Sequence, residues 1–199
     1  MDIGLVMTPS PYGTADMAKI GRRPAPPGDF EFYLTRLRAY MDGEVVDRDG
    51  SPSRIEWLED CEVLRVPIEV AATGPKVIDI AARHADRICF GVGADTERLE
   101  DCIDRARRTA EAAGRDPDSL RFGAFVNCVV NADRAVAREA IRGGLAGPLE
   151  EAISRFVEIR DCGIDFVRVV PGSRDMPRDV AATSIQALGK AVAAVADAA

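Results

Sequence analysis

The sequence predicts an α/β protein with mostly parallel strands, because short apolar runs alternate with stretches of helical periodicity. Four runs have the length and composition of buried strands, at residues 66–72, 87–90, 122–130 and 165–170. A helical pattern follows each run, and parallel pairing requires such a helical crossover between strands. The carboxyl ends of the strands, with the loops that follow them, should therefore share one edge of the sheet.

The helices are marked by apolar spacing and by residues that start or stop a helix. Residues 30–41 place Phe30, Leu34 and Leu37 at helical spacing, with Asp29 as a possible N-cap. The other helices are expected at residues 75–85, 96–113, 131–141, 149–160 and from about residue 176 to the end.

Two connections between these elements are expected to be irregular. Residues 47–54, with the sequence DRDGSPSR, carry turn residues without periodicity and should form a loop. Gly143 and Gly144 should interrupt the chain between two helices.

The composition indicates one domain, residues 1–199, with enough apolar material for a single core. Of the 199 residues, 47% are hydrophobic and 30% charged, and no run approaches the roughly 18 apolar residues of a membrane span. The net charge of -7 and the pI near 4.9 would repel a phosphate backbone, so no nucleic-acid partner is expected. Asp2 stands where a secretory signal has positive charge, so the cytoplasm is the expected compartment.

The cysteine and histidine pattern indicates neither a metal site nor a nucleophile. Five cysteines are an odd number, spread at wide intervals without a C-x-x-C pair, so we expect reduced thiols and no metal. The single histidine, His84, lies inside a predicted helix without an evident partner, where a partly exposed structural role is expected. No catalytic residue is assigned.

The segment VAATGPK, from Val70 to Lys76, joins a predicted strand to a predicted helix through a turn of small residues. A proline at the first helical turn leaves the unpaired N–H groups of that turn free, at the positive end of the helix dipole. Such a corner binds anions. Thr73 would add a hydroxyl donor, Gly74 would allow close approach to the backbone, and Lys76 would add positive charge. An ordinary tight turn is the alternative, and the local sequence leaves both open.

A second glycine-bearing corner, Gly91-Val92-Gly93, follows the next predicted strand and should lie at the same edge of the sheet. The chain has neither the G-x-G-x-x-G motif nor the lysine motif of P-loop proteins. The familiar nucleotide-binding fingerprints therefore do not describe these corners.

Four segments, taken in order, carry a resemblance to a known family. They are IGRRPAPPGDFEFYLTRLRAYMDGEVVDRDG, VPIEVAATGPKVIDIAARHADRICFGVGAD, AAGRDPDSLRF and CGIDFVRVVPGSRD. They resemble the later part of luciferase-like monooxygenase superfamily proteins, and most of all the branch that uses coenzyme F420, which includes methylenetetrahydromethanopterin reductase. The similarity runs from Ile20 to Asp175, and AATGPK and VPGSRD are its more specific parts.

The resemblance implies a TIM barrel and a cofactor site at the two corners. The backbone around Ala72, Thr73 and Gly74 would hold the phosphate of the cofactor, with the loop 91–93 beside it. The cofactor would be coenzyme F420, or alternatively FMN, and the reaction a hydride transfer to or from a small organic substrate. The protein would supply orientation and electrostatics, because the cofactor carries the electrons.

The chain departs from the family in size. A (β/α)₈ barrel takes about 250 residues, whereas this sequence has 199 and five convincing strands, counting the opening residues 1–8 as the first. The βα units that contribute ring-facing and substrate-facing residues in the family are not recognisable. An incomplete or truncated barrel is therefore expected, and exposed sheet edges would favour a homodimer.

Three interpretations remain open. The first is a shortened F420-dependent oxidoreductase, or an FMN-dependent monooxygenase, acting on an unknown substrate. The second is a degenerate, catalytically inactive luciferase-like flavoprotein. The third is a phosphate-ligand-binding α/β protein that shares only ancestry with the family. Absorbance of the purified protein in the deazaflavin and flavin bands, followed by titration with each cofactor, would separate the first from the others.

Overall fold

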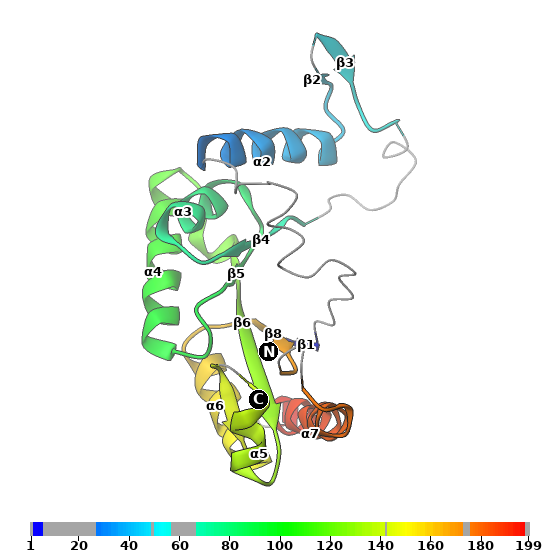
Figure 1. Cartoon of the computed structure of the whole chain (residues 1–199). Helices are drawn as coiled ribbons and strands as arrows, with labels where there is room; N and C mark the ends of the chain where they lie inside the picture. The colour runs from blue at the N-terminus through cyan, green and yellow to red at the C-terminus, as the bar shows by residue number, and fades with distance from the viewer. Residues whose placement is uncertain are drawn as a thin grey trace.

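A computed structural model of the chain describes residues 2–5, 27–48, 50–56, 67–141, 143–172 and 176–197. Within these ranges the main sheet has six strands, and all neighbouring strands pair in parallel (Figure 1). The strands are β1 (Asp2–Leu5), β4 (Glu69–Ala72), β5 (Arg87–Phe90), β6 (Arg121–Val130), β7 (Leu145–Gly147) and β8 (Phe166–Val170). The predicted α/β class with parallel strands is confirmed.

The strand order β1-β8-β6-β5-β4 is that of an arc of a barrel. Strand neighbours follow one another along the chain through β4, β5, β6 and β8, with the short β7 paired to the end of β6 outside this order. The last strand lies beside the first, as in a (β/α)₈ barrel. A doubly wound sheet would reverse its order partway. Among the described strands, β1 and β4 are the two ends and do not pair with each other. The described sheet is therefore open, in agreement with an incomplete barrel.

Helices pack in a row against the sheet and against one another. α2 contacts α3, α3 contacts α4, and α6 contacts α7, with α2 lying across the end of the molecule next to α3 (Figure 1). The helices are α2 (Pro27–Met41), α3 (Pro75–His84), α4 (Thr96–Ala112), α5 (Arg134–Glu139), α6 (Leu149–Asp161) and α7 (Arg178–Asp197), with a short 3₁₀ helix, η2 (Pro117–Ser119). No helix in the described ranges is long and apolar enough to cross a membrane.

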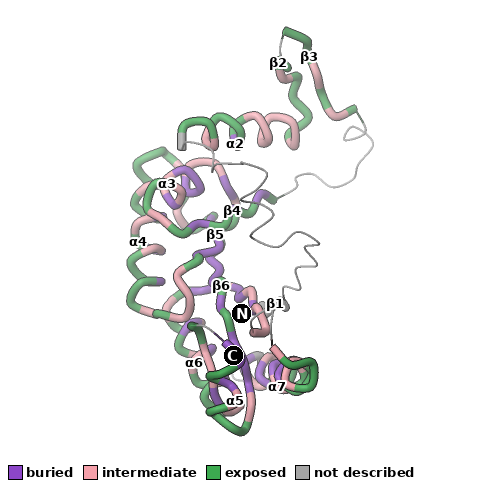
Figure 2. The backbone as a smooth tube through the Cα atoms, viewed as in Figure 1, coloured by how far each residue is buried: buried purple, intermediate pink, exposed green. Residues whose placement is uncertain are grey.

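The main core lies between the helices and one face of the sheet. Alternate strand residues point to this face, since side chains alternate along a strand. Those residues on β4, β5 and β6, among them Val70, Ile88, Phe90, Phe122 and Val126, are at most 4% exposed. Figure 2 shows that the buried residues lie along the central strands and on the sides of the helices that face the sheet. We call this helix-covered side the outer face, because it would be the outside of a closed barrel.

The structure corrects two predicted connections. The loop predicted at residues 47–54 contains an antiparallel hairpin of β2 (Val46–Arg48) and β3 (Ser51–Ser53). Its turn has Gly50 at φ 85°, and the Gly50 N–H donates to Asp47 Oδ1 at 2.7 Å. Three-residue strands that expose most of their side chains lack the apolar alternation on which the prediction depended.

The second correction concerns residues 143–147, where only a break was expected. β7 follows Gly144 directly and pairs with the last residues of β6, Cys128–Val130. Gly144 has φ 120°, and a Cβ there would lie 2.4 Å from the carbonyl oxygen of Asn127. The glycine pair thus allows the backbone to approach β6 closely enough to pair, which the sequence pattern does not reveal.

Candidate functional site

The two glycine-bearing corners lie side by side at the carboxyl edge of the sheet. Thr73 and Gly74 follow β4, and Gly91 follows β5, whose Phe90 is in register with Ala72 of β4. The Gly91 N–H donates to the carbonyl oxygen of Ala72 at 2.8 Å. This arrangement confirms the prediction that both corners share one end of a parallel sheet.

α3 begins at the first corner with backbone donors and no side-chain cap. Gly74 is the N-cap, in an extended conformation with φ -136° and ψ 160°, and Pro75 opens the helix. The N–H groups of Val77 and Ile78 both donate to the Gly74 carbonyl oxygen at 3.1 Å. Gly74 and Lys76 therefore carry the remaining N–H groups of the first turn, at the positive end of the helix dipole.

α4 begins at the second corner in a different way. Its N-cap, Asp95, accepts a hydrogen bond from the Arg98 N–H at 3.2 Å. An aspartate at the N-cap satisfies backbone donors and offsets the helix dipole. Of the two helices that start at these corners, α3 is therefore the one whose first turn is open to an external anion.

The glycines of the two corners have different roles. A Cβ at Gly91 would lie 2.5 Å from Thr73 Cγ2, so the two corners touch only because Gly91 has no side chain. Gly93 has φ 78°, in the region that favours glycine. A Cβ at Gly74 would meet nothing within 4 Å, and its φ is ordinary for any residue. The space above Gly74 is thus free for a ligand.

A groove between α3 and α4 opens beside the first corner. It is a hollow of about 370 Å³, with Thr73, Gly74 and Val92 at the end nearest the sheet. α4 supplies its charged wall, with Arg98, Asp101, Arg105 and Arg108. Arg105 is bound by Asp79 of α3 through two hydrogen bonds, at 2.7 and 2.6 Å.

The side of the sheet opposite the helices, which we call the inner face, carries charge. Glu69 on β4 and Arg168 on β8 form an ion pair at 2.9 Å, although β5 and β6 lie between their strands. Strands are about 4.8 Å apart, so this contact requires the sheet to curve toward its inner face. The Arg168 guanidinium also lies 4.9 Å from the ring centre of Phe166.

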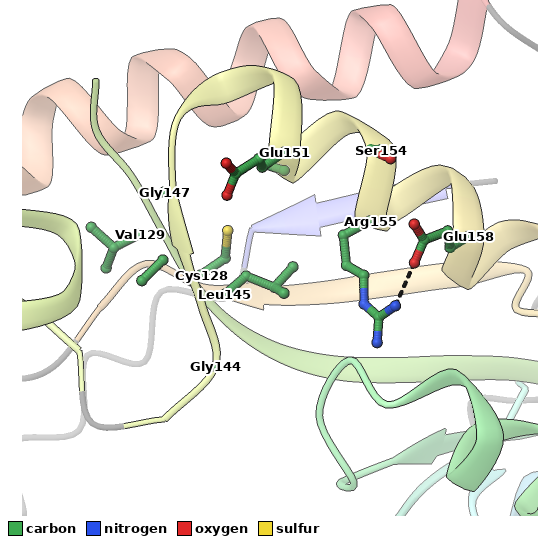
Figure 3. Close-up of a pocket in the computed structure, with 11 residues that line it drawn as sticks. Cys128, Val129, Gly144, Leu145, Gly147, Glu151, Ser154, Arg155 and Glu158 are labelled. Carbon is green, nitrogen blue, oxygen red and sulfur yellow. Dashed lines mark hydrogen bonds and ion pairs between the residues drawn. The ribbon is translucent and has the colours of Figure 1, made fainter. Parts of the chain in front are cut away.

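A second hollow, of about 430 Å³, lies at the carboxyl end of β6 between β7 and α6 (Figure 3). Figure 3 shows Glu151 reaching from α6 toward Gly147, and Arg155 paired with Glu158 on the same helix. Glu151 is itself paired with Arg134. Because these charges neutralise one another, this hollow suits an anion less well than the corner at Gly74.

The four cysteines in the described part of the chain are not activated as nucleophiles. Burial raises the pKa of Cys89 and of Cys128 to about 12, and it also raises the pKa of Cys102 and Cys162, so these thiols stay protonated at neutral pH. In the described part of the chain, no three His, Cys, Asp or Glu side chains are placed to hold a metal ion.

His84 joins two helices. Its Nε2 lies 2.9 Å from Glu31 Oε1 on α2, and Arg83 Nε donates to the same oxygen at 2.8 Å. These two contacts hold the pKa of Glu31 below its usual value, with Arg83 as the larger cause. The expected structural role of His84 thus agrees with its position.

The predicted site residues lie close together, but they differ in solvent exposure. Thr73 and Lys76 are exposed, Gly74, Val92 and Gly93 are partly exposed, and Ala72 is fully buried with its carbonyl oxygen already bonded. The end of the VPGSRD segment, residues 173–175, lies outside the described residues. The arginines of the groove were not predicted as site residues. The available signal was their spacing, since Arg98 and Arg105 are seven residues apart and therefore lie on one side of a helix.

Comparison with known proteins assigns the chain to a family model. Residues 12–192 match the model described as luciferase-like monooxygenase. This range includes both corners, the groove and all but the first of the main-sheet strands.

Two curated relatives match about half of the chain. The F420-dependent hydroxymycolic acid dehydrogenase of Mycobacterium tuberculosis is 32% identical over 111 residues, which cover 54% of this chain and 30% of the relative. The 5,10-methylenetetrahydromethanopterin reductase of Methanolobus tindarius is 25% identical over 108 residues, which cover 54% and 33%. The matched segment thus spans about a third of each relative.

Solved structures with a similar fold cover most of the chain. An F420-dependent secondary alcohol dehydrogenase, in complex with an F420–acetone adduct, superposes with a TM-score of 0.71 at 16% identity, covering 90% of this chain and 66% of the other. The coenzyme F420-dependent tetrahydromethanopterin reductase of Methanopyrus kandleri gives 0.62 at 14% identity, covering 90% and 71%. A long-chain alkane monooxygenase gives 0.57 at 15% identity, covering 88% and 60%. At such identities the similarity establishes the fold, an open part of a TIM-barrel arrangement.

Proposed function

Because this chain belongs to the luciferase-like monooxygenase family, we propose that it binds coenzyme F420 and takes part in hydride transfer to or from a small organic substrate. The name of one curated relative, the hydroxymycolic acid dehydrogenase, and the names of two similar structures include coenzyme F420 and support this choice of cofactor class. The match of the family model to residues 12–192 supports a single domain over residues 1–199. Since the chain matches only about a third of the curated relatives, activity on a substrate is part of the proposal.

The observation that carries the proposal is the uncapped start of α3 at Gly74. A phosphate placed above Gly74 would receive hydrogen bonds from the N–H groups of Gly74 and Lys76 and from the Thr73 hydroxyl. Gly91, Val92 and Gly93 would line the neighbouring side, while Ala72 fixes the position of the second corner through its bond to Gly91. The open space at Gly74 fits such a group, because nothing occupies the 4 Å around a Cβ built there.

The chain's own contribution would be binding and orientation. When bound, the deazaflavin ring supplies the hydride chemistry. The corner at Gly74 would hold the phosphate end of the cofactor and so limit where its ring can lie relative to the protein. Lys76, exposed at the helix flank, would neutralise part of the phosphate charge.

FMN is the alternative cofactor, and the same corner would accept its phosphate. A similar fold is found in a riboflavin lyase solved with modified FMN, at a TM-score of 0.61 and 12% identity. An inactive protein that still binds a phosphate ligand is the remaining alternative. These alternatives differ in what the purified protein binds and in whether the bound cofactor is reduced or oxidised by a substrate.

Isothermal titration with F420, FMN and inorganic phosphate tests the site. Gly74→Asp places a carboxylate where the phosphate would lie, without backbone strain, and should lower cofactor affinity at least about tenfold. Lys76→Ala should lower it roughly twofold to fivefold, because the backbone donors remain. Ala193→Asp, on an exposed position of α7, adds the same charge elsewhere and should have no effect.

Three results would contradict parts of the proposal. Unchanged affinity in a folded Gly74→Asp protein would exclude the corner as the phosphate site. Binding of FMN but not of F420 would favour the flavin alternative. Absence of binding of both cofactors to the wild-type protein would overturn the proposed function.

We also propose a homodimer, because the described surface retains an aromatic patch on α2. Phe32 is 62% exposed and Tyr33 is 59% exposed, next to a hollow of about 590 Å³ between α2 and the β2–β3 hairpin. Exposed apolar patches of this kind often mark protein contacts. Light scattering should give the mass of a dimer, and Tyr33→Arg should shift it toward the monomer. A monomeric wild-type protein at micromolar concentration would contradict the proposal.

A further inference from the structure

The hollow of about 590 Å³ between α2 and the β2–β3 hairpin lies apart from the corner at Gly74. One side of α2 faces the end of α3, where Glu31 Oε1 lies 2.9 Å from His84 Nε2 and Arg38 pairs with Asp86. His84 is the last residue of α3, whereas Gly74 precedes its first. The helix that carries the hollow therefore meets α3 at the end away from the corner.

The lining of this hollow combines apolar side chains with positive charge. Tyr40 falls about half a turn of the helix from Glu31 and Arg38, so the side of α2 that lines the hollow points away from α3. The aromatic and aliphatic residues of the lining are Phe32, Tyr33, Leu37, Tyr40, Met41 and Ile55. Its charged residues are Arg36, Arg48 and Arg54, and no carboxylate is among the described residues that line it. The charge of the lining is thus entirely positive, in a protein whose net charge is -7.

One arginine joins the two walls of the hollow. The Arg36 guanidinium donates to the carbonyl oxygen of Asp47 on β2 and lies 5.2 Å from the ring centre of Phe32. The Asp47 side chain accepts instead from the Gly50 N–H, in the turn of the hairpin. Arg48 is exposed, and no ion pair to it is found among the described residues. Its guanidinium is therefore available to an anion in the hollow.

We propose that this hollow binds a small molecule made of an aliphatic chain and one carboxylate group. Ligand pockets are typically concave, about 300–1,000 Å³ in volume and mainly apolar, with a few polar groups that fix orientation. The apolar lining would cover the chain, and the guanidinium fork of an arginine matches the two oxygens of a carboxylate. The inference does not rest on the proposed function, because no residue of the corner lines the hollow. A second copy of this chain is the alternative occupant.

Isothermal titration with ligands of equal chain length tests the charge preference. Decanoate carries the anionic group, decanol carries no charge, and decyltrimethylammonium carries the opposite charge. The wild-type protein should bind decanoate about threefold to tenfold more tightly than decanol, as expected for partly exposed ion pairs, and should bind the cation least. Octanoate should bind about fourfold to fifteenfold more weakly than decanoate, because each buried methylene raises the affinity by up to about fourfold.

Variants assign the binding to the hollow. Arg48→Glu reverses an exposed charge and should lower the affinity for decanoate about fivefold or more, while that for decanol stays nearly unchanged. Arg138→Glu is the matched control, because Arg138 is also exposed but lies on α5, outside the hollow. Ser53→Trp, which fills part of the hollow from β3, should weaken the binding of both ligands.

Four results would overturn the inference. Decanoate that does not bind in the millimolar range, or that binds no more tightly than decanol, would contradict the proposed ligand class. A loss at Arg138→Glu as large as that at Arg48→Glu would show a general effect of net charge. Decanoate binding that weakens as the protein concentration rises would show that a second copy fills the hollow. Competition between decanoate and F420 would place decanoate at the corner at Gly74 instead, and it would leave the proposed function untouched.

Discussion

The two faces of the sheet are built from alternate residues of the same strands, yet they differ in exposure and in charge. The outer face is apolar, and its β6 residues Phe122, Ala124 and Val126 are at most 2% exposed. The inner face exposes Phe125 and Asn127 from the same strand. It also holds the ion pair of Glu69 and Arg168.

The outer face stabilises the fold, whereas the inner face is left for function. Burial of the outer face against α3, α4, α6 and α7 supplies the apolar contacts that stabilise the domain. In a closed (β/α)₈ barrel the inner face is filled by packed side chains, whereas in the described part of this chain it leaves Phe125 and Asn127 exposed. We therefore expect substitutions on the outer face to change stability strongly and those on the inner face to change it much less.

The sharpest test of the comparison uses two phenylalanines of β6. Phe122→Ala on the outer face should cost about 3–5 kcal/mol in the free energy of unfolding, because it leaves a cavity in the core. Phe125→Ala, at a side chain that is 36% exposed, should cost about 1 kcal/mol or less. Urea denaturation measures both. Similar losses at the two positions would mean that the inner face is packed as tightly as the outer one.

On the inner face Gly123 lies close against the ring of Phe166 on the neighbouring strand. A Cβ at Gly123 would lie 2.2 Å from Phe166 Cε2, so Gly123→Ala should cost about 1–3 kcal/mol through overpacking. Gly189→Ala is the control, since nothing lies within 4 Å of its Cβ position in α7. It should stabilise the protein by up to about 1 kcal/mol. The loss at Gly123 should shrink when Phe166→Ala is combined with it; full additivity would contradict this contact.

A smaller effect is expected from the ion pair that spans the inner face. A double-mutant cycle with Glu69→Gln and Arg168→Met should give a coupling of about 0.2–1 kcal/mol in low salt, because both side chains are about one third exposed. High salt should reduce it. Zero coupling in low salt would show that curvature of the sheet does not depend on this pair.

Two buried thiols distinguish the faces at alkaline pH, Cys89 on the inner face and Cys128 on the outer. Burial raises the pKa of each to about 12 from 9.0, with Glu69 adding to the rise at Cys89 and Arg168 opposing it. Because the folded pKa is the higher one, the stability that each thiol contributes is complete below pH 9 and is lost between about pH 9 and 12.

Unfolding measured from pH 8 to 10.5 tests this expectation. Cys89→Ala and Cys128→Ala should each flatten the alkaline loss of stability, by at most about 1.4 kcal/mol per pH unit. Arg168→Met should change the ionisation of Cys89 and leave that of Cys128 unaltered, which distinguishes the two faces. Rapid modification of either thiol in the folded protein at pH 8 would contradict the raised pKa.

Much of the framework follows from local sequence signals. The apolar run before Thr73 predicts the end of β4, although the observed strand starts at Glu69 and not at residue 66. The helical spacing after Pro75 predicts α3 to within one residue of its observed bounds. The predicted start of the next helix at residue 96 is also the observed start of α4, because its N-cap, Asp95, acts within one turn of the chain. The short strands β2, β3 and β7 were not predicted, because three residues are too few to show a periodic pattern. The pairing of β7 also depends on the close approach of the Gly144 backbone to β6.

The sequence by itself determined the α/β alternation, the two glycine corners and the absence of a side-chain cap at Gly74, because each depends on residues within one or two turns of each other. Only the tertiary structure decided which distant groups meet. It brings Thr73 against Gly91, curves the sheet until Glu69 reaches Arg168, and sets Arg98 and Arg108 along a groove held open by Asp79 and Arg105. Strand order and helix packing fix these distances, and neither is encoded in any single stretch of the chain.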